Sequence, residues 1–316
     1  MAVPKWSLFG GDMMLKAYVF LKSTVLRTAV AGILMVALSG FVCAKTASAS
    51  DARTYIYGTG ATAKGARALK IDFFAAQNTC SALRPTVLLI HGGGFRIGSR
   101  NAASLREIAA QLNAQGFNAA SMDYRLVRDR PVPSIDVANL KGARQKVENA
   151  ANAAIEDTAM AMRWIAANAQ SLCADPHKIA LLGTSAGSVM ALFTTYALDT
   201  SPVTRPTPLA VISFWGGYLT PSAFERGDPP LFLIHGTNDQ TVPYAHSLAL
   251  HKAARAKGIP VSFHTVVDGG HGFKSIDPLT DTIDGVPILD EVMAFIAAAA
   301  QGNAPPTQTT RTKHRD

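Results

Sequence analysis

The sequence contains little of what a metal-binding or nucleotide-binding protein requires. It has three cysteines, at positions 43, 80 and 173, and they do not combine with histidines in the spacing of a zinc site. Its run of three glycines lacks the Lys-Ser/Thr ending of a phosphate loop. We therefore predict no metal and no other cofactor.

The net charge is also small outside the two ends of the chain. The formal net charge is +8, but residues 1–49 hold five basic residues and one acidic residue. Residues 301–316 hold three basic residues and one acidic residue, which leaves +2 on residues 50–300. So small an excess does not predict a nucleic-acid-binding or membrane-binding surface.

The apolar run near the N-terminus is too short for a membrane-spanning helix. Basic residues precede the apolar residues 28–42, and only 17 uncharged residues separate the flanking charges, where a spanning helix needs about 20. Small residues at 47–49 resemble a signal cleavage site. We interpret 1–49 as a signal peptide cleaved near Ala49, with translation from Met1 or Met14, and expect an exported (periplasmic or secreted) protein. The alternative is an uncleaved signal anchor.

Strand and helix patterns alternate through residues 50–300. Short apolar runs predict buried strands at 86–90, 178–182, 209–212, 231–234 and 261–267. Amphipathic patterns predict helices at 104–115, 155–170, 186–198, 244–257 and 289–299. This alternation predicts one α/β domain, with a mostly parallel twisted sheet and helices on both faces. Residues 301–316, rich in Pro, Thr and Gln, predict a disordered tail.

The most informative motif is Gly-Thr-Ser-Ala-Gly at 183–187, between a predicted strand and a predicted helix. In so tight a turn, side chains at Gly183 and Gly187 would collide, so both positions require hydrogen. The turn exposes the side-chain hydroxyl of Ser185 at the start of a helix. Ser185 is therefore the predicted nucleophile.

A glycine-rich loop, His-Gly-Gly-Gly-Phe at 91–95, follows the strand predicted at 86–90. Three consecutive glycines cost backbone entropy, so they indicate either a tight turn or a loop whose N–H groups approach a ligand closely. Attack by Ser185 on a carbonyl would create an oxyanion that such donors stabilise. Ala186, at the positive end of its helix, supplies one more N–H.

These two motifs together resemble those of the α/β-hydrolase esterases, in the hormone-sensitive-lipase-like and feruloyl-esterase-like branches. The resemblance runs from about residue 85 to about 298. It includes Asp-Tyr-Arg-Leu at 123–126, Glu-Asp at 156–157 ahead of Arg-Trp at 163–164, and Asp-Pro-His-Lys-Ile at 175–179. It implies the α/β-hydrolase fold. By position it places the oxyanion donors at Gly93, Gly94 and Ala186. Many members have glycine where this chain has Ser188, from which we expect a small packing difference.

The predicted general base is His271. For this fold the chain order is serine, acid, histidine, which leaves five of the eight histidines. His271 lies between glycines directly after a predicted strand. The other four fit a helix, a strand or the tail: His246, His251, His264 and His314.

The predicted acid is Asp239. It follows the strand at 231–234, in a stretch that ends with the acid in the families this chain resembles. An Asx-turn or an N-cap is its structural alternative, and both roles can coexist. Asp268 is the rival acid, but it lies three residues from His271 and would more naturally bond its own loop.

Three further features have structural interpretations. His91 and His235 each end a strand before a glycine, which favours a role in loop geometry. Phe214 and Trp215 either line a pocket or belong to the core. Residues 128–154 form an insertion, which is either a small cap over the active-site mouth or a solvated surface excursion.

The resemblance also implies a disulfide between Cys80 and Cys173. Each lies six residues before a predicted strand position, Thr86 and Ile179, and those strands are parallel neighbours in the fold that this chain resembles. Signal cleavage would remove Cys43, and an oxidising compartment favours pairing of the two that remain. Two unpaired buried thiols are the alternative.

As a whole, the resemblance implies an exported serine carboxylesterase that hydrolyses short acyl esters, acetyl and feruloyl esters among them, with a small-molecule ester as its partner. An aminopeptidase or formamidase with the same triad is the alternative. A non-catalytic binding module of the same fold is less consistent with a complete triad.

Overall fold

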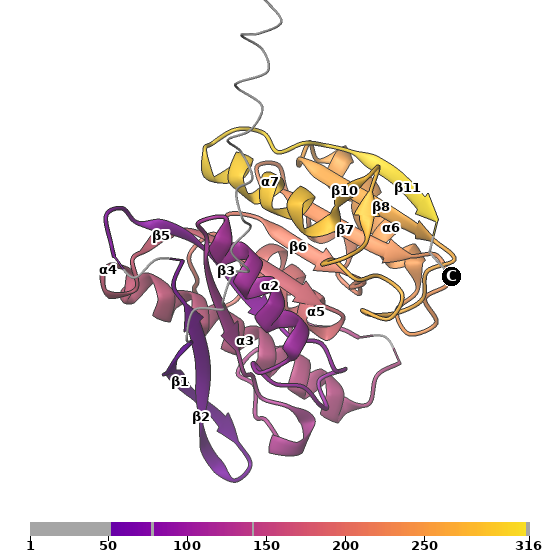
Figure 1. The fold of residues 1–316 in the computed structure, drawn as a ribbon. Coiled ribbons are helices and arrows are strands. Elements are labelled where there is room, and N and C mark those ends of the chain that lie inside the picture. Colours follow the sequence, from indigo (N-terminus) through magenta and orange to yellow (C-terminus); the bar gives the residue numbers. More distant parts are fainter. Residues whose placement is uncertain (1–51, 77–78, 141, 314–316) are drawn as a thin grey trace, which may run out of the picture. The chain divides into compact units, whose positions relative to one another are not determined.

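The computed structural model describes residues 52–313, except 77–78 and 141. The predicted signal peptide therefore lies outside the described residues. The main feature is a nine-stranded sheet in the order β1-β2-β4-β3-β5-β6-β7-β8-β11 (Figure 1). Its strands are β1 (Arg53–Thr62), β2 (Gly65–Phe74), β3 (Arg84–Ile90), β4 (Asn118–Met122), β5 (Ala174–Thr184), β6 (Val211–Phe214), β7 (Leu231–Gly236), β8 (Val261–Val267) and β11 (Thr309–Lys313).

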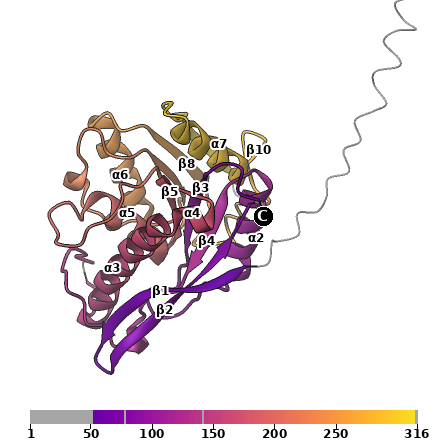
Figure 2. The same ribbon diagram turned by 90° about the vertical axis from the view of Figure 1, so that its left-hand side faces the viewer.

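The sheet is mostly parallel, with helices on both faces. Only the β1–β2 and β2–β4 pairs are antiparallel. The main helices are α2 (Ala103–Ala114), α3 (Gln145–Ala167), α4 (Ala169–Leu172), α5 (Ala186–Tyr196), α6 (Tyr244–Ala256) and α7 (Ile288–Ala300). Figure 2 shows α3, α5 and α6 on one side of the sheet and α2 and α7 on the other. This architecture confirms the predicted fold class.

Each central strand is apolar because it supplies both cores. In β3, Leu88 and Ile90 belong to the core beneath α3, α5 and α6, whereas Val87 and Leu89 belong to the core beneath α2 and α7. Successive side chains of a strand point to opposite faces, so a strand covered on both sides reads as one continuous apolar run. Among the described residues, no helix is long and apolar enough to cross a bilayer.

The predicted insertion is shorter than its sequence suggested. Helix α3 begins at Gln145, ten residues before the predicted start, because Val147, Ala150 and Ala154 bury an apolar face there. The part before the helix is not a solvated excursion, since Ile135, Ala138 and Leu140 are buried in the core. Leu140 also lines the cavity at Ser185, which favours the cap interpretation for this part.

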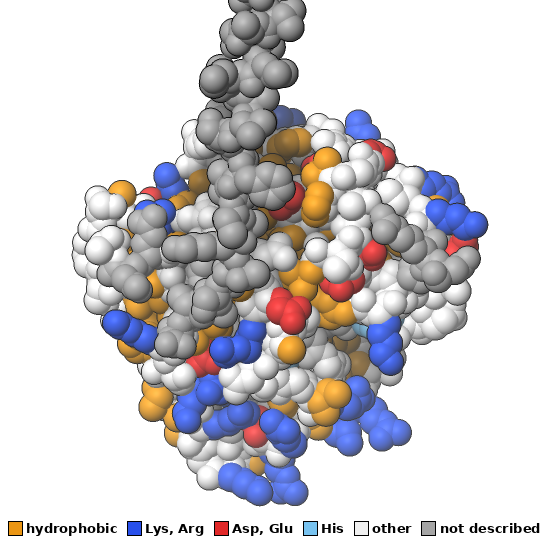
Figure 3. Space-filling view, in the orientation of Figure 1, with side chains coloured by type: hydrophobic (Ala, Val, Ile, Leu, Met, Phe, Trp, Pro, Cys, Tyr) orange, Lys and Arg blue, Asp and Glu red, His pale blue; other side chains and the backbone are white. Residues whose placement is uncertain are grey.

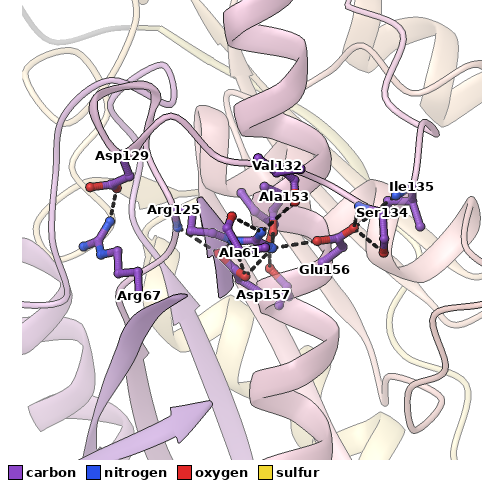
Figure 4. A network of polar contacts seen from close by, with 12 residues as sticks. Ala61, Arg67, Arg125, Asp129, Val132, Ser134, Ile135, Ala153, Glu156 and Asp157 are labelled. Carbon is purple, nitrogen blue, oxygen red and sulfur yellow. Dashed lines mark hydrogen bonds and ion pairs between the residues drawn. The ribbon is translucent and has the colours of Figure 1, made fainter. Parts of the chain in front are cut away.

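A buried ion-pair network attaches the β1–β2 hairpin and residues 131–135 to α3 (Figure 4). The Arg125 guanidinium donates to Asp157 at 2.9 Å and to Glu156 at 2.6 Å. It also donates to the carbonyl oxygen of Ala61 at 3.1 Å. Glu156 in turn accepts from the Ser134 hydroxyl at 2.8 Å. Two of the motifs behind the family resemblance, at 123–126 and 156–157, are therefore the two halves of this contact.

The prediction of a disordered tail is wrong for the described residues. Thr309–Lys313 form β11, which pairs in parallel with β8 from Thr309 opposite Phe263 to Lys313 opposite Val267. Composition indicated disorder because the tail has few apolar residues. The free edge of β8 supplies the backbone hydrogen bonds that stabilise it instead.

The structure joins Cys80 and Cys173 in a disulfide, with Cα atoms 5.5 Å apart. Cys173 directly precedes β5, and Cys80 precedes β3, the parallel neighbour of β5. The bond lies at the amino ends of these strands, the end opposite to Ser185.

Removing this disulfide should destabilise the domain without impairing the active site. Replacing both Cys80 and Cys173 with serine should lower the free energy of unfolding by about 2–4 kcal/mol, because the bond closes a loop of 93 residues. Urea unfolding of the two proteins measures this difference. Denatured, unreduced protein lacking residues 1–49 should contain no free thiol, and finding two would contradict the pairing.

Candidate active site

Ser185 occupies a strained turn between β5 and α5. Its backbone angles, φ 52° and ψ −116°, are unusual for a residue with a side chain. A Cβ added to Gly183 would lie 2.2 Å from the carbonyl oxygen of Gly187, and one added to Gly187 would lie 2.1 Å from that of Ile90. Both glycines are therefore required by steric exclusion, as the motif predicted, and the serine hydroxyl is presented at the carboxyl edge of the sheet.

The three residues predicted as a triad form a hydrogen-bonded series. The Nε2 atom of His271 lies 2.9 Å from Oγ of Ser185, and its Nδ1 atom lies 2.6 Å from Oδ2 of Asp239. Asp239 follows β7 and His271 follows β8, so neighbouring parallel strands bring them together at the same edge of the sheet. This geometry suits transfer of a proton from serine to histidine.

Asp268, the rival acid, does not contact His271. Its backbone N–H donates to Oγ1 of Thr237 at 2.9 Å. Its side chain is exposed and, among the described residues, accepts no hydrogen bond. Asp268 therefore bonds its loop through its backbone and not through its side chain. The structure favours Asp239 as the partner of His271.

Asp239 is held as an ionised carboxylate. Oδ1 accepts the backbone N–H groups of Thr241 and Val242, both at 2.8 Å, which is the predicted Asx-turn. Burial by itself would raise the pKa of Asp239, but hydrogen bonds from His235, His271 and these two N–H groups hold that pKa well below its usual range. A carboxylate held in this charged form favours the tautomer of His271 that carries its hydrogen on Nδ1. The N-cap of the following helix is Pro243 rather than Asp239.

His235 contributes to the site in a way that the sequence interpretation missed. Its Nε2 atom lies 3.1 Å from Oδ2 of Asp239 and 2.9 Å from the carbonyl oxygen of Val242. Both partners are acceptors, so Nε2 carries a proton. Its Nδ1 atom lies 2.7 Å from Oγ of Ser247 on α6. The signal in the sequence was a histidine four residues before the acid, which we assigned only to loop geometry.

The glycine loop presents free N–H donors beside Ser185. Within the described part of the chain, the N–H groups of Gly93, Gly94 and Ala186 donate no hydrogen bond. Gly93 has φ +111° and Gly94 has φ +58°. A Cβ on Gly93 would lie 2.1 Å from the carbonyl oxygen of Ile97, so only glycine fits there. This arrangement suits an oxyanion site.

His91 supports the loop from below, as predicted. It is buried and stacks on Tyr124 with ring centroids 4.2 Å apart. Its Nδ1 atom lies 2.7 Å from the carbonyl oxygen of Gly92, and burial lowers its pKa. A neutral, stacked imidazole therefore fixes the start of the loop.

Substituting Gly94 should impair turnover more than substrate binding. A β-branched residue such as valine is strained at φ +58°, so Gly94→Val should displace the loop N–H groups. We expect kcat to fall by about 10²–10³, the value of one oxyanion donor, with a smaller change in KM. Gly65→Val is the matched control, because Gly65 has φ +105° in open space at the hairpin. Normal kcat in Gly94→Val would contradict the assignment.

Two other sequence interpretations are resolved by packing. Ser188 is buried, and its hydroxyl lies 2.5 Å from the carbonyl oxygen of Gly183 and 2.9 Å from that of Phe214. Phe214 and Trp215 both belong to the core, and Trp215 also lines a cavity beside Ser185. Among the described residues, no group of three His, Cys, Asp or Glu side chains is placed to hold a metal ion.

Two family models match the chain in the regions that hold these residues. The BD-FAE model matches residues 71–143 and 137–205, which include the glycine loop and Ser185. The model described as the prolyl oligopeptidase family matches residues 218–283, which include Asp239 and His271.

Two similar proteins of Mycobacterium tuberculosis are named as esterases. Carboxylesterase NlhH is 31% identical over 157 residues, which are 46% of this chain and 40% of that protein. Esterase LipI is 29% identical over 217 residues, which are 66% of this chain and 60% of that protein. The chain thus spans less than two thirds of the length of these curated relatives.

Solved structures share the fold. Thermogutta terrifontis esterase 2, in the form phosphorylated by paraoxon, superimposes with a TM-score of 0.61 at 20% sequence identity, covering 82% of this chain and 98% of that one. At this identity the likeness shows the fold alone. The chain therefore has the α/β-hydrolase fold, and its sequence is similar to that of proteins named as esterases.

Proposed function

We propose that the chain is a serine carboxylesterase that hydrolyses short-chain acyl esters through an acyl-enzyme. The observation that carries the proposal is the continuous contact from Ser185 through His271 to an ionised Asp239, beside three free N–H donors. The esterase names of the similar proteins support it.

In the proposed mechanism, Oγ of Ser185 attacks the ester carbonyl and its proton passes to Nε2 of His271. Asp239 accepts a hydrogen bond from the Nδ1–H group of His271, so the unprotonated Nε2 can act as the base. The carboxylate also stabilises the imidazolium that forms. The N–H groups of Gly93 and Gly94, with that of Ala186, bind the oxyanion. The bond to the alcohol then breaks and Nε2 protonates the leaving oxygen. Water repeats the sequence on the acyl-enzyme.

The match to the prolyl oligopeptidase family makes an aminopeptidase the second candidate. Recognition of a peptide's ammonium group calls for a carboxylate near the nucleophile. Among the described residues that line the two cavities at Ser185, there is no Asp or Glu, and the charged residue that does line one of them is Arg96. This favours the ester.

Parallel assays with 4-nitrophenyl acetate and an aminoacyl 4-nitroanilide distinguish the candidates. The esterase proposal predicts hydrolysis of the acetate with little or none of the anilide. The reverse preference would assign the chain to the peptidases. Hydrolysis of neither, by a folded protein, would favour a binding module.

We also propose that the protein is exported. The support comes from the basic and apolar pattern of residues 1–49 and from the disulfide between Cys80 and Cys173, which is typical of oxidising compartments. Fractionation of a tagged full-length chain, with N-terminal sequencing of the product, tests both export and cleavage near Ala49.

A further inference from the structure

Ser185 lines two cavities that differ in size and in most of their lining residues. One has a volume of about 320 Å³ and is lined by Leu140, Val147, Val189 and Tyr218 among others. The other has a volume of about 500 Å³ and is lined by Ile97, Trp215, His271 and Phe273 among others. Both volumes fall in the range of about 300–1,000 Å³ typical of ligand sites. An ester bound at Ser185 can therefore place its two halves in separate cavities.

The chemistry of the triad decides which half enters which cavity. The alcohol oxygen must receive its proton from Nε2 of His271 when the ester bond breaks, so the alcohol lies on the side of that imidazole. His271 and Gly272 line only the larger cavity, which we call the alcohol-side cavity. The acyl group stays on Ser185 and is left with the smaller one, beside Ala186.

The wall of the alcohol-side cavity is apolar. Ile97 is 66% exposed there, although it is a large aliphatic side chain. Phe273 is partly exposed and packs edge-on against the buried Trp215, with ring centroids 5.2 Å apart. Ala102, the N-cap of α2, and Leu105 within α2 also line the cavity. An apolar group that packs against this wall is removed from water, which is favourable.

Polar recognition is sparse in the same cavity. Apart from His271, its described lining residues carry no ionisable side chain other than His91, whose pKa is lowered by burial. In the face shown in Figure 3, Lys and Arg side chains gather instead at the lower end of the view, around the β1–β2 hairpin. Besides Ser185, the hydroxyls that line the cavity are those of Ser104, Thr184 and Thr241, and Thr184 is buried. A sugar or glycerol placed there would therefore find fewer hydrogen-bond partners than it has in water.

From these contacts we infer that the alcohol-side cavity selects esters of apolar alcohols as large as an aromatic ring, with Ile97 and Phe273 as the side chains that determine this selectivity. The inference rests on the proposed function. It names the alcohol class, which neither the motifs nor the similar proteins specify.

The test uses acetate esters, so that the acyl group is constant and only the alcohol varies. The kcat/KM of benzyl acetate should be at least about 10-fold higher than that of methyl acetate or of 6-O-acetylglucose. A factor of this size is usual for a few apolar contacts. Ile97→Ser and Phe273→Ala should each reduce the benzyl-to-methyl ratio about 5- to 10-fold. Ile56→Ser is the matched control, because Ile56 is also exposed, at 59%, but lies on β1 away from the cavity.

A variant in the smaller cavity separates the two sides. Ala143→Trp should shift the preferred acyl chain of methyl esters to a shorter one and leave the benzyl-to-methyl ratio of the acetates unchanged.

Failure of this inference is distinguishable from failure of the proposed function. If acetates are hydrolysed but benzyl acetate has no advantage, or if Ile97→Ser and Phe273→Ala change acyl preference instead, the cavity assignment is wrong. If no ester is hydrolysed and paraoxon does not phosphorylate Ser185, the esterase proposal itself is wrong.

Discussion

Replacing Ser185 with alanine should reduce kcat for 4-nitrophenyl acetate by about 10⁶, to the level left by the oxyanion donors and substrate binding. The reason is that Oγ is the atom that forms the acyl-enzyme in the proposed mechanism, and the described part of the site holds no second hydroxyl within hydrogen-bond distance of Nε2 of His271. Alanine is smaller and keeps the helix start intact, so the fold should not change.

Two controls accompany this variant: a measurement of its stability, and the substitution of a serine outside the site. Urea unfolding should give the same midpoint as wild type, because the Ser185 side chain is only partly buried. Ser171→Ala, which removes an exposed hydroxyl on α4, should retain full activity. More than a few per cent of wild-type turnover in a folded Ser185→Ala protein would reject the nucleophile assignment.

Replacing Asp239 with asparagine should reduce kcat by about 10⁴. Oδ1 of Asp239 already accepts two backbone N–H groups, so an amide there would turn its NH₂ toward His271. That NH₂ requires an acceptor, which moves the imidazole proton to Nε2. A proton on Nε2 faces Ser185 and prevents it from acting as a base. Rate measurements on a correctly folded variant test this.

Asp268→Asn is the matched control for the same change of charge. Its carboxylate is exposed and its backbone has φ +64°, a conformation that asparagine adopts readily. Activity should therefore change little. If Asp268→Asn instead lost more activity than Asp239→Asn, the acid role would pass to Asp268.

The local parts of the site could be predicted because short-range sterics dictate them. The turn at Ser185 accepts only glycine at positions 183 and 187, because a Cβ atom there would lie 2.2 Å and 2.1 Å, respectively, from a backbone carbonyl oxygen. The glycines of the loop were recognisable for the same kind of reason, and the apolar strands were recognisable because both of their faces are covered. The chain order of serine, acid and histidine then left few candidates.

Prediction failed where a partner far along the chain decides the conformation. The tail at 309–313 has the composition of a disordered segment, yet it pairs with the edge of β8. Helix α3 starts early because its first turns bury Val147 and Ala150 against a core that the local sequence does not reveal. Such contacts depend on tertiary packing, which overrides local propensity.

The sequence by itself determined the fold class and singled out Ser185 and His271 as the candidate nucleophile and base, because each follows from local sterics or from the order of strands. The pairing of Cys80 with Cys173 was implied by the family resemblance, with two unpaired thiols as the alternative, and the structure decided for the disulfide. Only the tertiary structure decided between Asp239 and Asp268, since both follow strands and only distance separates them. It alone revealed the contact of His235 with the acid and the two cavities at Ser185. These features are formed by side chains from several strands and helices, and no local pattern encodes where such side chains meet.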